Sequence, residues 1–269
     1  MTLFLPQHPG TVLLVGAGPG DLGLLTVTGL RALERADVIV ADRLGARSVI
    51  DQLETERGAP LDAEIIDVGK QPGHHPVPQS GINDILITQA KLGHRVVRLK
   101  GGDPFVLGRG GEEVIACRAA GVDVRVVPGV TSANSVPAVA GIPLTHRGVA
   151  TAYTVVTGHD QLSEIGGGRD HTVVVLMGVG TLIHSTMVLA RSGRGEDCPV
   201  AIVEDGFGEN QRVTIGTLGD IAHRAAARGV RSPAVIVAGD VVTMSPYADG
   251  AFAEAAHRDP ATTDLVRNP

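Results

Sequence analysis

RVVRLKGGDPFVLGRGGEE, residues 95–113, is the stretch that decides the fold. It begins with a short β-branched and aliphatic run at 96–99, which is typical of a strand buried on both faces. The run breaks into GGDP at 101–104, where glycines free the backbone and proline ends the strand. Three more glycines follow before the acids at 112–113 begin a helical pattern. A tight turn needs only one or two glycines, so the stretch predicts a strand end where the backbone closely approaches a ligand.

The same alternation of strand, loop and helix continues on both sides of this stretch. Apolar runs predict strands, and apolar residues at helical spacing predict helices. The expected strands are 11–15, 38–41, 64–68 and 122–127, and the expected helices are 24–36, 79–92 and 112–120. Repeated units of this kind indicate a largely parallel α/β sheet. We therefore expect residues 1–145 to form an N-terminal α/β domain that carries the glycine loops and the catalytic residues.

The pattern changes near residues 140–150. Further strands are expected at 153–157, 172–177, 200–204, 212–215 and 234–238, with helices near 182–191 and 218–227. This arrangement predicts a second α/β domain with a mixed sheet over 146–246. The following residues, 247–269, are small and polar, and we expect a poorly ordered tail there.

The composition is that of a globular protein without a nucleic-acid surface. Its net charge is -6, and it has no Trp, two Tyr and four Phe, so a broad basic field and base-stacking platforms are both lacking. No apolar run reaches the length of a membrane span, and the first residues do not resemble a signal peptide. Cys117 and Cys198 fit neither a disulfide framework nor a metal site. We therefore expect a cytoplasmic protein with no membrane or nucleic-acid partner.

A second glycine loop, GAGPGD at 16–21, invites comparison with the dinucleotide-binding fingerprint. That fingerprint needs a third glycine where this chain has Asp21, and Pro19 stiffens the loop. Asp42 follows the second expected strand, but it comes later than the ribose-binding acid of that motif. No Gly-Lys-Ser/Thr follows, which excludes a phosphate P-loop. Nicotinamide or flavin binding is therefore a distant alternative.

Taken together, the two loops and the segments between them closely resemble the uroporphyrinogen-III C-methyltransferases, a branch of the tetrapyrrole methylases that use S-adenosylmethionine (SAM). The likeness runs from residue 12 to 242. The matching segments are VGAGPGD (15–21), ADRL (41–44), VGK and GHH (68–75), VPQ (77–79), VVRLKGGDPF and GRGGEE (96–113), VPGVTSA (127–133), AGIPLTHR (140–147), VTGH (156–159), LMG (176–178), VEDG (203–206), QRV (211–213) and PAVIVAGDVV (233–242).

The resemblance implies two α/β domains with SAM in the cleft between them, and a homodimer. It assigns Asp42 as proton acceptor and Lys70 as proton donor. The implied SAM contacts are Pro19, Gly101, Gly102, Asp103, Val106, Thr131, Ser132, Met177 and Gly206. Because the family's substrate carries eight carboxylates, a basic lining is expected, with His74, His75, Arg109, His146 and Arg147 as candidates. No metal is implied, since His74-His75 has no companion ligand at metal spacing.

Several of these residues have ordinary structural alternatives. Asp42 is also suited to capping a helix or pairing with Arg43. Thr131 is equally suited to capping, and Met177, taken alone, is expected to be a core residue of a strand. The acids at 112–113 are expected to start a helix rather than to act as a catalytic pair, because adjacent helical residues do not face each other.

The function implied by the resemblance is methylation of uroporphyrinogen III, through precorrin-1 to precorrin-2, for sirohaem or cobalamin synthesis. The closest alternative is a sister methylase acting on a later corrin precursor. A SAM-binding or nucleotide-binding regulator without catalysis is an alternative of another class. Ala41, Gln71 and Gly148 stand where relatives commonly have other residues, and these departures bear on the substrate pocket rather than on the cofactor.

Overall fold

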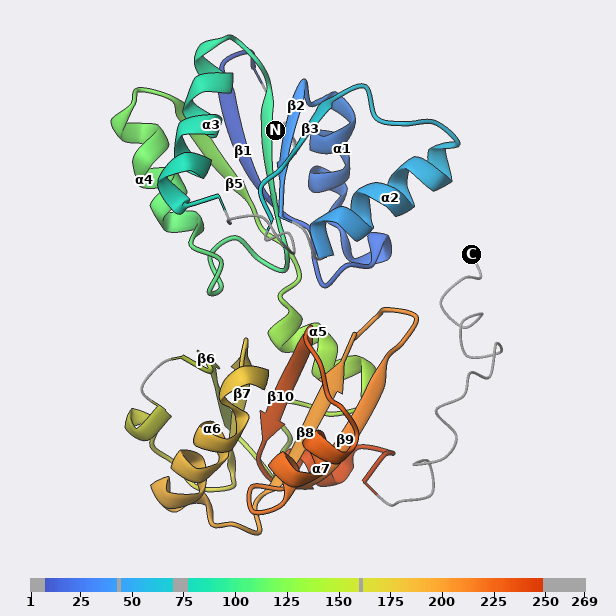
Figure 1. Cartoon of the computed structure of the whole chain (residues 1–269), viewed down its shortest axis with the longest axis vertical. Helices are drawn as coiled ribbons and strands as arrows, with labels where there is room; N and C mark the ends of the chain where they lie inside the picture. Colours follow the sequence, from blue (N-terminus) through green and yellow to red (C-terminus); the bar gives the residue numbers. More distant parts are fainter. Residues whose placement is uncertain (1–7, 43–44, 70–76, 160–161, 249–269) are drawn as a thin grey trace. The chain divides into compact units, whose positions relative to one another are not determined.

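The structure is a computed structural model that describes residues 8–42, 45–69, 77–159 and 162–248 (Figure 1). The chain divides into two compact units, Met1–Val136 and Pro137–Pro269. The expected domain boundary after residue 145 lies a short way beyond this division and stays a prediction. Most of the expected tail, residues 249–269, lies outside the described residues.

The first unit contains a five-stranded sheet in the order β3-β2-β4-β1-β5. Every neighbouring pair in it is parallel, as the sequence predicts. The central strand β4 is buried along its whole length, which confirms the buried strand predicted from the apolar run at 96–99. The strands are β1 (Thr11–Gly16), β2 (Val38–Ala41), β3 (Glu64–Asp67), β4 (Val96–Lys100) and β5 (Asp123–Val127).

Helices cover both faces of this sheet (Figure 1). Apolar side chains of α1 and α2 form one core with one face of the sheet, and those of α3 and α4 form a second core on the opposite face. The unit is therefore doubly wound, an arrangement that leaves the carboxyl ends of the parallel strands as the usual ligand edge. The helices of this unit are α1 (Val27–Arg35), α2 (Gly45–Arg57), α3 (Gln79–Lys91) and α4 (Gly110–Ala119). The division between the two units falls within α5 (Ser132–Val139).

Two helices of this unit differ from the sequence expectation. The helix expected from residue 24 begins at Val27, because Thr26 caps it by accepting from the backbone N–H of Gly29 at 3.1 Å. Helix α2 was not predicted, although its buried residues follow the i, i+3, i+4, i+7 spacing of an amphipathic helix. Those buried residues are Ala46, Val49, Ile50 and Leu53.

The second unit contains a mixed sheet in the order β6-β7-β10-β8-β9, also as predicted. Only the β6–β7 pair is parallel among the pairs described, and the others are antiparallel. Helices α6 (Leu182–Leu189) and α7 (Ile221–Ala227) pack on this sheet and share its core. The strands are β6 (Ala152–Thr157), β7 (His171–Leu176), β8 (Pro199–Glu204), β9 (Arg212–Thr217) and β10 (Ala234–Ala238).

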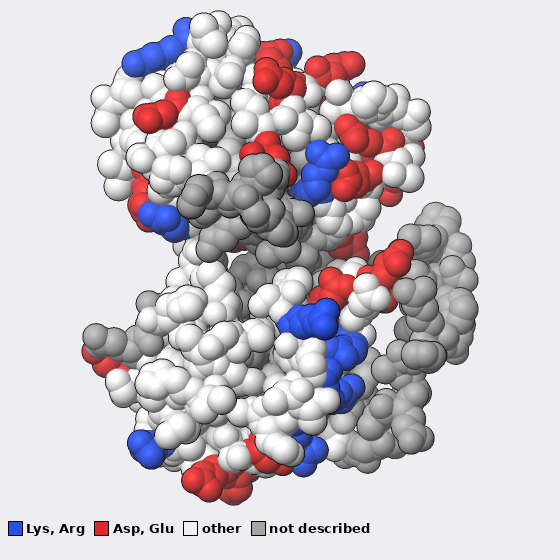
Figure 2. All heavy atoms as spheres, viewed as in Figure 1, with Lys and Arg blue, Asp and Glu red and all other residues white. Residues whose placement is uncertain are grey.

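Short helical segments complete the description. The 3-10 segments are Leu22–Leu24, Leu162–Glu164, Val179–Thr181 and Asp240–Met244, and the π segment is Ala190–Arg194. Across the described part of the chain, we find no helix with the length and apolarity needed to cross a membrane. On the face of the first unit that Figure 2 shows, acidic and basic side chains are interspersed and no broad basic surface is visible.

An ion pair ties β2 to β4 at the amino end of the sheet. Arg95 donates from Nη2 to Asp37 Oδ1 at 2.6 Å and from Nε to Asp37 Oδ2 at 3.0 Å. The Arg95 backbone N–H also donates to Asp37 Oδ2 at 2.7 Å. These hydrogen bonds, the side-chain bonds first, lower the pKa of Asp37 to about 2. The pair therefore stabilises the ionised form of Asp37 in the folded state.

Replacing Asp37 by asparagine is expected to lower the free energy of unfolding at pH 7 by about 1 kcal/mol, since solvent screens this half-exposed pair. Because folding depresses the pKa of Asp37, its contribution is complete above the unfolded pKa of about 3.9 and fades as the pH falls toward 2. Urea denaturation at pH 7, 5 and 3.5 should show the two proteins converging in acid. A gap that widens on acidification contradicts this account. Asp51→Asn, which breaks an exposed pair with Arg47, is the control and should change stability less.

Candidate active site

Three glycines bring three loops into backbone contact at the carboxyl edge of the first sheet. Gly16 ends β1, and Gly102 and Gly129 follow β4 and β5. A Cβ atom added to Gly16 would lie 2.5 Å from the Gly129 Cα and 2.6 Å from the Gly102 carbonyl oxygen. Gly102 also donates its N–H to the Gly18 carbonyl at 2.7 Å and accepts from the Gly18 N–H at 3.2 Å. The glycines are therefore required by close packing of these loops on one another. The sequence predicts a close backbone approach to a ligand at this point, and that part stays a prediction.

Asp103 fastens two of these loops together. Its Oδ1 accepts from the Phe105 N–H at 2.8 Å, and its Oδ2 accepts from the Gly129 N–H at 3.0 Å. The neighbouring Gly101 is exposed, and a Cβ atom there would meet no atom within 4 Å. The loop after β4 therefore exposes the backbone of Gly101, and the hydrogen bonds of the Asp103 carboxylate fix the conformation of this loop.

The hydroxyls expected at a helix start are found there. Thr131 precedes α5, and its Oγ1 accepts from the Ala133 N–H at 3.3 Å, so capping is one of its roles. Ser132 is the first residue of α5 and is partly exposed, as is Thr131. On the loop after β1, Pro19 is partly exposed, and the adjacent Gly20 carbonyl accepts from side chains of α2.

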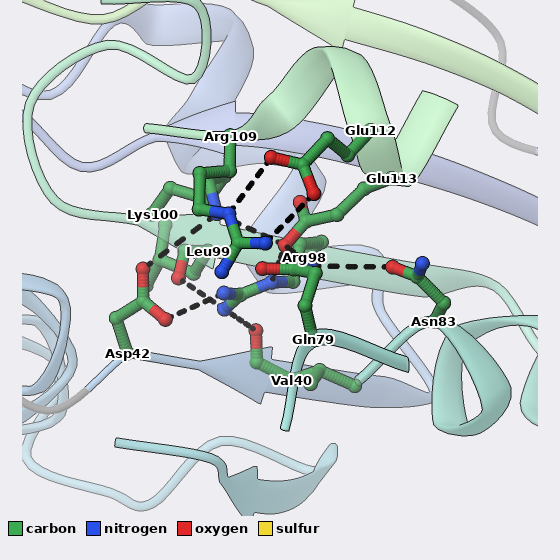
Figure 3. A network of polar contacts seen from close by, with 10 residues as sticks. All are labelled: Val40, Asp42, Gln79, Asn83, Arg98, Leu99, Lys100, Arg109, Glu112 and Glu113. Atoms are coloured by element: carbon green, nitrogen blue, oxygen red, sulfur yellow. Dashed lines mark hydrogen bonds and ion pairs between the residues drawn. The ribbon is translucent and has the colours of Figure 1, made fainter. Parts of the chain in front are cut away.

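Asp42, the expected proton acceptor, lies at the carboxyl end of β2 and is held by buried charges (Figure 3). Arg98 donates from Nη2 to Asp42 Oδ1 at 2.5 Å and from Nε to Glu113 Oε1 at 3.1 Å. Lys100 donates to the same Glu113 oxygen at 3.0 Å, and its Nζ lies 3.9 Å from Asp42 Oδ2. Two cations and two carboxylates therefore form one network, which we call the Asp42 network: Asp42, Arg98, Lys100 and Glu113.

The interior part of this network is almost completely removed from water. The side chains of Arg98, Lys100 and Glu113 are 1%, 5% and 0% exposed, whereas that of Asp42 is 36% exposed. Burial, reinforced by the charge of Arg98, lowers the pKa of Lys100, and the carboxylates of Glu113 and Asp42 oppose that shift. Asp42 is therefore the member of the network that reaches the surface.

Sequence reasoning did not identify Arg98, Lys100 or Glu113 as site residues. The available signal was two basic residues at alternate positions of a strand that is otherwise apolar, since such positions share one face. The same reasoning correctly separated the two acids that open α4. Glu112 is exposed and accepts from Arg109, whereas Glu113 points into the network.

Arg109 lies beside an open depression of the first unit. It directly precedes α4 with a positive φ of 56°, and it donates from Nε and Nη2 to Glu112 at 2.8 Å each. These hydrogen bonds lower the pKa of Glu112. The depression has a volume of about 400 Å³, and Val106 lies partly buried in the same loop. Its lining residues are Phe105, Leu107, Arg109, Gly110, Gly111 and Glu112.

Four of the predicted residues belong to the second unit. Met177 directly follows β7 with a positive φ of 54° and is 54% exposed, so it is not the core methionine that its sequence alone suggests. Gly206 follows β8 between two residues with positive φ, Asp205 and Phe207. His146 and Arg147 are exposed on a tight turn in which the His146 N–H donates to the Ala150 carbonyl at 2.8 Å.

The other predicted residues, Lys70, His74 and His75, lie outside the described residues. The residues that the structure does describe include no group of three His, Cys, Asp or Glu arranged to hold a metal ion. Of the predicted residues in the first unit, the structure places Pro19, Asp42, Gly101, Gly102, Asp103, Val106, Thr131 and Ser132 on segments that follow β1, β2, β4 and β5.

Known proteins resemble this chain over nearly its whole length. It is 47% identical to a uroporphyrinogen-III C-methyltransferase of Methanocaldococcus jannaschii over 245 residues, which cover 87% of this chain and 98% of that protein. A solved uroporphyrin-III-C-methyltransferase of Thermus thermophilus is 37% identical with a TM-score of 0.72, over 94% of this chain and 99% of that one. Another Thermus thermophilus structure of this enzyme, complexed with S-adenyl homocysteine, is 39% identical with a TM-score of 0.70, over 86% and 98%.

The family model described as tetrapyrrole (corrin/porphyrin) methylases matches residues 11–222. These residues begin with β1 and end within α7, so they include strands and helices of both units. The resemblance that the sequence motifs indicate is thereby confirmed: the chain belongs to the tetrapyrrole methylases.

Proposed function

We propose that this protein is a SAM-dependent C-methyltransferase that converts uroporphyrinogen III through precorrin-1 to precorrin-2 by two successive methylations. The observation that carries the proposal is the position of Asp42, held by Arg98 at the sheet edge where the glycine loops converge. The identity of 47% to a uroporphyrinogen-III C-methyltransferase supports the choice of substrate.

The residues at this edge fit SAM, which supplies a methyl group on a sulfonium when bound. Gly101 is exposed and presents its backbone with no side chain in the way. The N–H and C=O of Gly102 are already paired with Gly18, so its contact with the cofactor is included on the family resemblance. Asp103 uses one lone pair of each oxygen within the loops and retains others for an ammonium or hydroxyl group. Thr131 and Ser132 offer hydroxyls at a helix start, which suits a carboxylate. Further contacts are included on the family resemblance: Pro19, Val106, Met177 and Gly206.

The protein's own work in this reaction is orientation and proton handling. Holding two reactants in line and free of water is worth about 7–11 kcal/mol in favourable cases. Once the ring carbon has gained a methyl group, the ring must lose a proton. We assign Asp42 as its acceptor, because this carboxylate is partly exposed at the ligand edge. Lys70 is assigned as proton donor on the family resemblance.

Substrate recognition is assigned to basic side chains, because the family's substrate carries eight carboxylates. Arg109 is exposed beside the open depression, and His146 and Arg147 are exposed on their turn. His74 and His75 join them on the family resemblance. A carboxylate that binds Arg109 competes with Glu112, so this contact exchanges one ion pair for another.

Three further features belong to the proposal. A homodimer follows from the family resemblance. A cytoplasmic location agrees with two buried cysteines that carry free thiols, Cys117 and Cys198. The product precorrin-2 would serve sirohaem or cobalamin synthesis.

Anaerobic incubation of the purified protein with uroporphyrinogen III and methyl-labelled SAM tests the proposal. Mass spectrometry is expected to show two added methyl groups per tetrapyrrole and one S-adenosylhomocysteine released for each. If uroporphyrinogen III gains no methyl group while precorrin-2 does, the protein is a sister methylase of a later step and the substrate assignment is wrong.

A further inference from the structure

We infer that Arg98 is a positioning residue for Asp42, which it holds by Oδ1 so that Oδ2 is left to accept the proton from the substrate. The inference rests on the proposed function, in which Asp42 is the base. It adds a second residue to that reaction, together with the atom of Asp42 that reacts.

The guanidinium of Arg98 is fixed from several directions (Figure 3). Its Nη1 donates to the carbonyls of Val40 and Leu99 at 3.2 Å each, and its Nε donates to Glu113 at 3.1 Å. Its Nη2 then remains for Asp42 Oδ1, at 2.5 Å. A planar group with these bonds and a side chain 1% exposed cannot turn without breaking several of them. Arg98 therefore fixes the direction of the Asp42 carboxylate.

Glu113 is the anchor on the far side of Arg98. It is fully buried in the first turn of α4, and its Oε1 accepts from Arg98, from Lys100 and from Gln79 Nε2 at 3.2 Å. These bonds hold Arg98 between a carboxylate in the interior and one at the surface. The series from Glu113 through Arg98 to Asp42 thus runs from the core to the ligand edge.

The two oxygens of Asp42 have different surroundings. Oδ1 accepts the short bond from Arg98. Oδ2 lies 3.9 Å from Lys100 Nζ, which is beyond hydrogen-bond distance. Among the described residues, none donates a hydrogen bond to Oδ2, and the Asp42 side chain is 36% exposed, so Oδ1 is held by the interior while Oδ2 can still accept a proton. With Oδ1 held in this way, the carboxylate presents Oδ2 to the substrate proton in one fixed direction, as a general base requires.

Stability alone does not account for this arrangement. The backbone ladder from Val38 to Ala41 already joins β2 to β4, and the Arg95–Asp37 pair reinforces it at the amino end. Buried ion pairs are often no more stabilising than apolar residues of similar size, because removing charges from water is costly. A buried Arg98 beside Asp42 is therefore better explained by the orientation of that carboxylate.

The test compares steady-state kinetics of Arg98→Lys, Asp42→Asn and the double variant, with Arg95→Lys as the matched control. Arg95 lies on the same chain segment and also pairs with an aspartate that flanks β2, but at the amino end. Arg98→Lys is expected to lower kcat about 10- to 100-fold, the effect of a misplaced reacting group, with the KM for SAM and for uroporphyrinogen III within about twofold of wild type. Arg95→Lys is expected to retain wild-type kcat.

The double variant separates positioning from support of the fold. If Arg98 acts through Asp42, Arg98→Lys should change kcat less than about twofold in the Asp42→Asn background. An equal loss in both backgrounds, or wild-type kcat for Arg98→Lys alone, overturns the inference. A rise in KM with kcat unchanged also overturns it, because it indicates a binding role.

Folding of each variant is checked by circular dichroism and by calorimetric binding of S-adenosylhomocysteine. If Arg98→Lys does not fold, Glu113→Gln replaces it, since glutamine keeps an acceptor for Arg98 but removes the charge that anchors it. Glu113→Gln is expected to lower kcat in the wild-type background and not in the Asp42→Asn background. An equal loss of kcat in both backgrounds counts against the inference.

Failure of the proposed function gives a different result from failure of the inference. If the wild-type protein does not methylate uroporphyrinogen III, the proposed function is contradicted, and the same comparison of variants is then made with precorrin-2. Full activity of Asp42→Asn overturns the inference itself.

Discussion

Asp42→Asn is expected to lower kcat for methyl transfer by about 10²- to 10⁴-fold, the usual contribution of a positioned general base. Asparagine keeps the shape of the side chain, and its carbonyl oxygen can still accept from Arg98 Nη2. It cannot take up a proton at neutral pH, so transfer should stall at the loss of the ring proton. Anaerobic assays with labelled SAM, followed by mass spectrometry, measure the loss directly.

Cofactor binding provides the internal control for this variant. None of the backbone groups at Gly101, Gly102 or Gly129 depends on Asp42, so the affinity for S-adenosylhomocysteine should stay within about twofold of wild type. Asp37→Asn is the matched variant at the opposite end of β2, where the aspartate also pairs with an arginine. It should retain full activity. Wild-type kcat for Asp42→Asn would remove this residue from the mechanism.

Gly129→Ala is expected to disrupt the ligand edge as a whole. The added methyl group would overlap the Gly102 carbonyl oxygen and come within 2.6 Å of the Gly16 Cα. Both are backbone atoms, so neither can move aside as the end of a flexible side chain would. Overpacking of this kind costs about 1–3 kcal/mol of stability. Because the loops must shift to relieve it, kcat/KM should fall about 10²-fold as reacting groups lose their alignment.

Urea denaturation and binding of S-adenosylhomocysteine check this prediction. Gly166→Ala is the control, because Gly166 is exposed in the second unit and a Cβ atom there would meet nothing within 4 Å. It should leave both stability and binding unchanged within experimental error. Wild-type binding by Gly129→Ala would mean that the loops tolerate a wider spacing than their contacts indicate.

The sequence was a good guide wherever one segment determines its own structure. The apolar run at Val38–Ala41 is a strand with the predicted ends, and the glycines after β1, β4 and β5 mark a close backbone approach. The carboxyl edge as the site of the candidate residues also followed, because parallel strands align their ends.

The Asp42 network was beyond the reach of such reasoning. Its central bond joins residues 56 positions apart, and it depends on which strands are neighbours and in what register. The sequence places Arg98 inside the expected strand and Arg95 just before it, but it does not show that Arg98 is buried against Asp42 while Arg95 is half-exposed. The exposure of Met177 is a similar case, since it depends on a positive φ just after β7.

The stacked glycines also limit how this protein can evolve. Gly16, Gly102 and Gly129 contact one another through backbone atoms, so no exchange of side chains can reshape that surface by small steps. A Cβ atom added at Gly16 or Gly129 would overlap backbone atoms of the neighbouring loops. Descendants of such a chain can change only through segments away from the stack, while the glycines and the loop shapes that they impose must be retained.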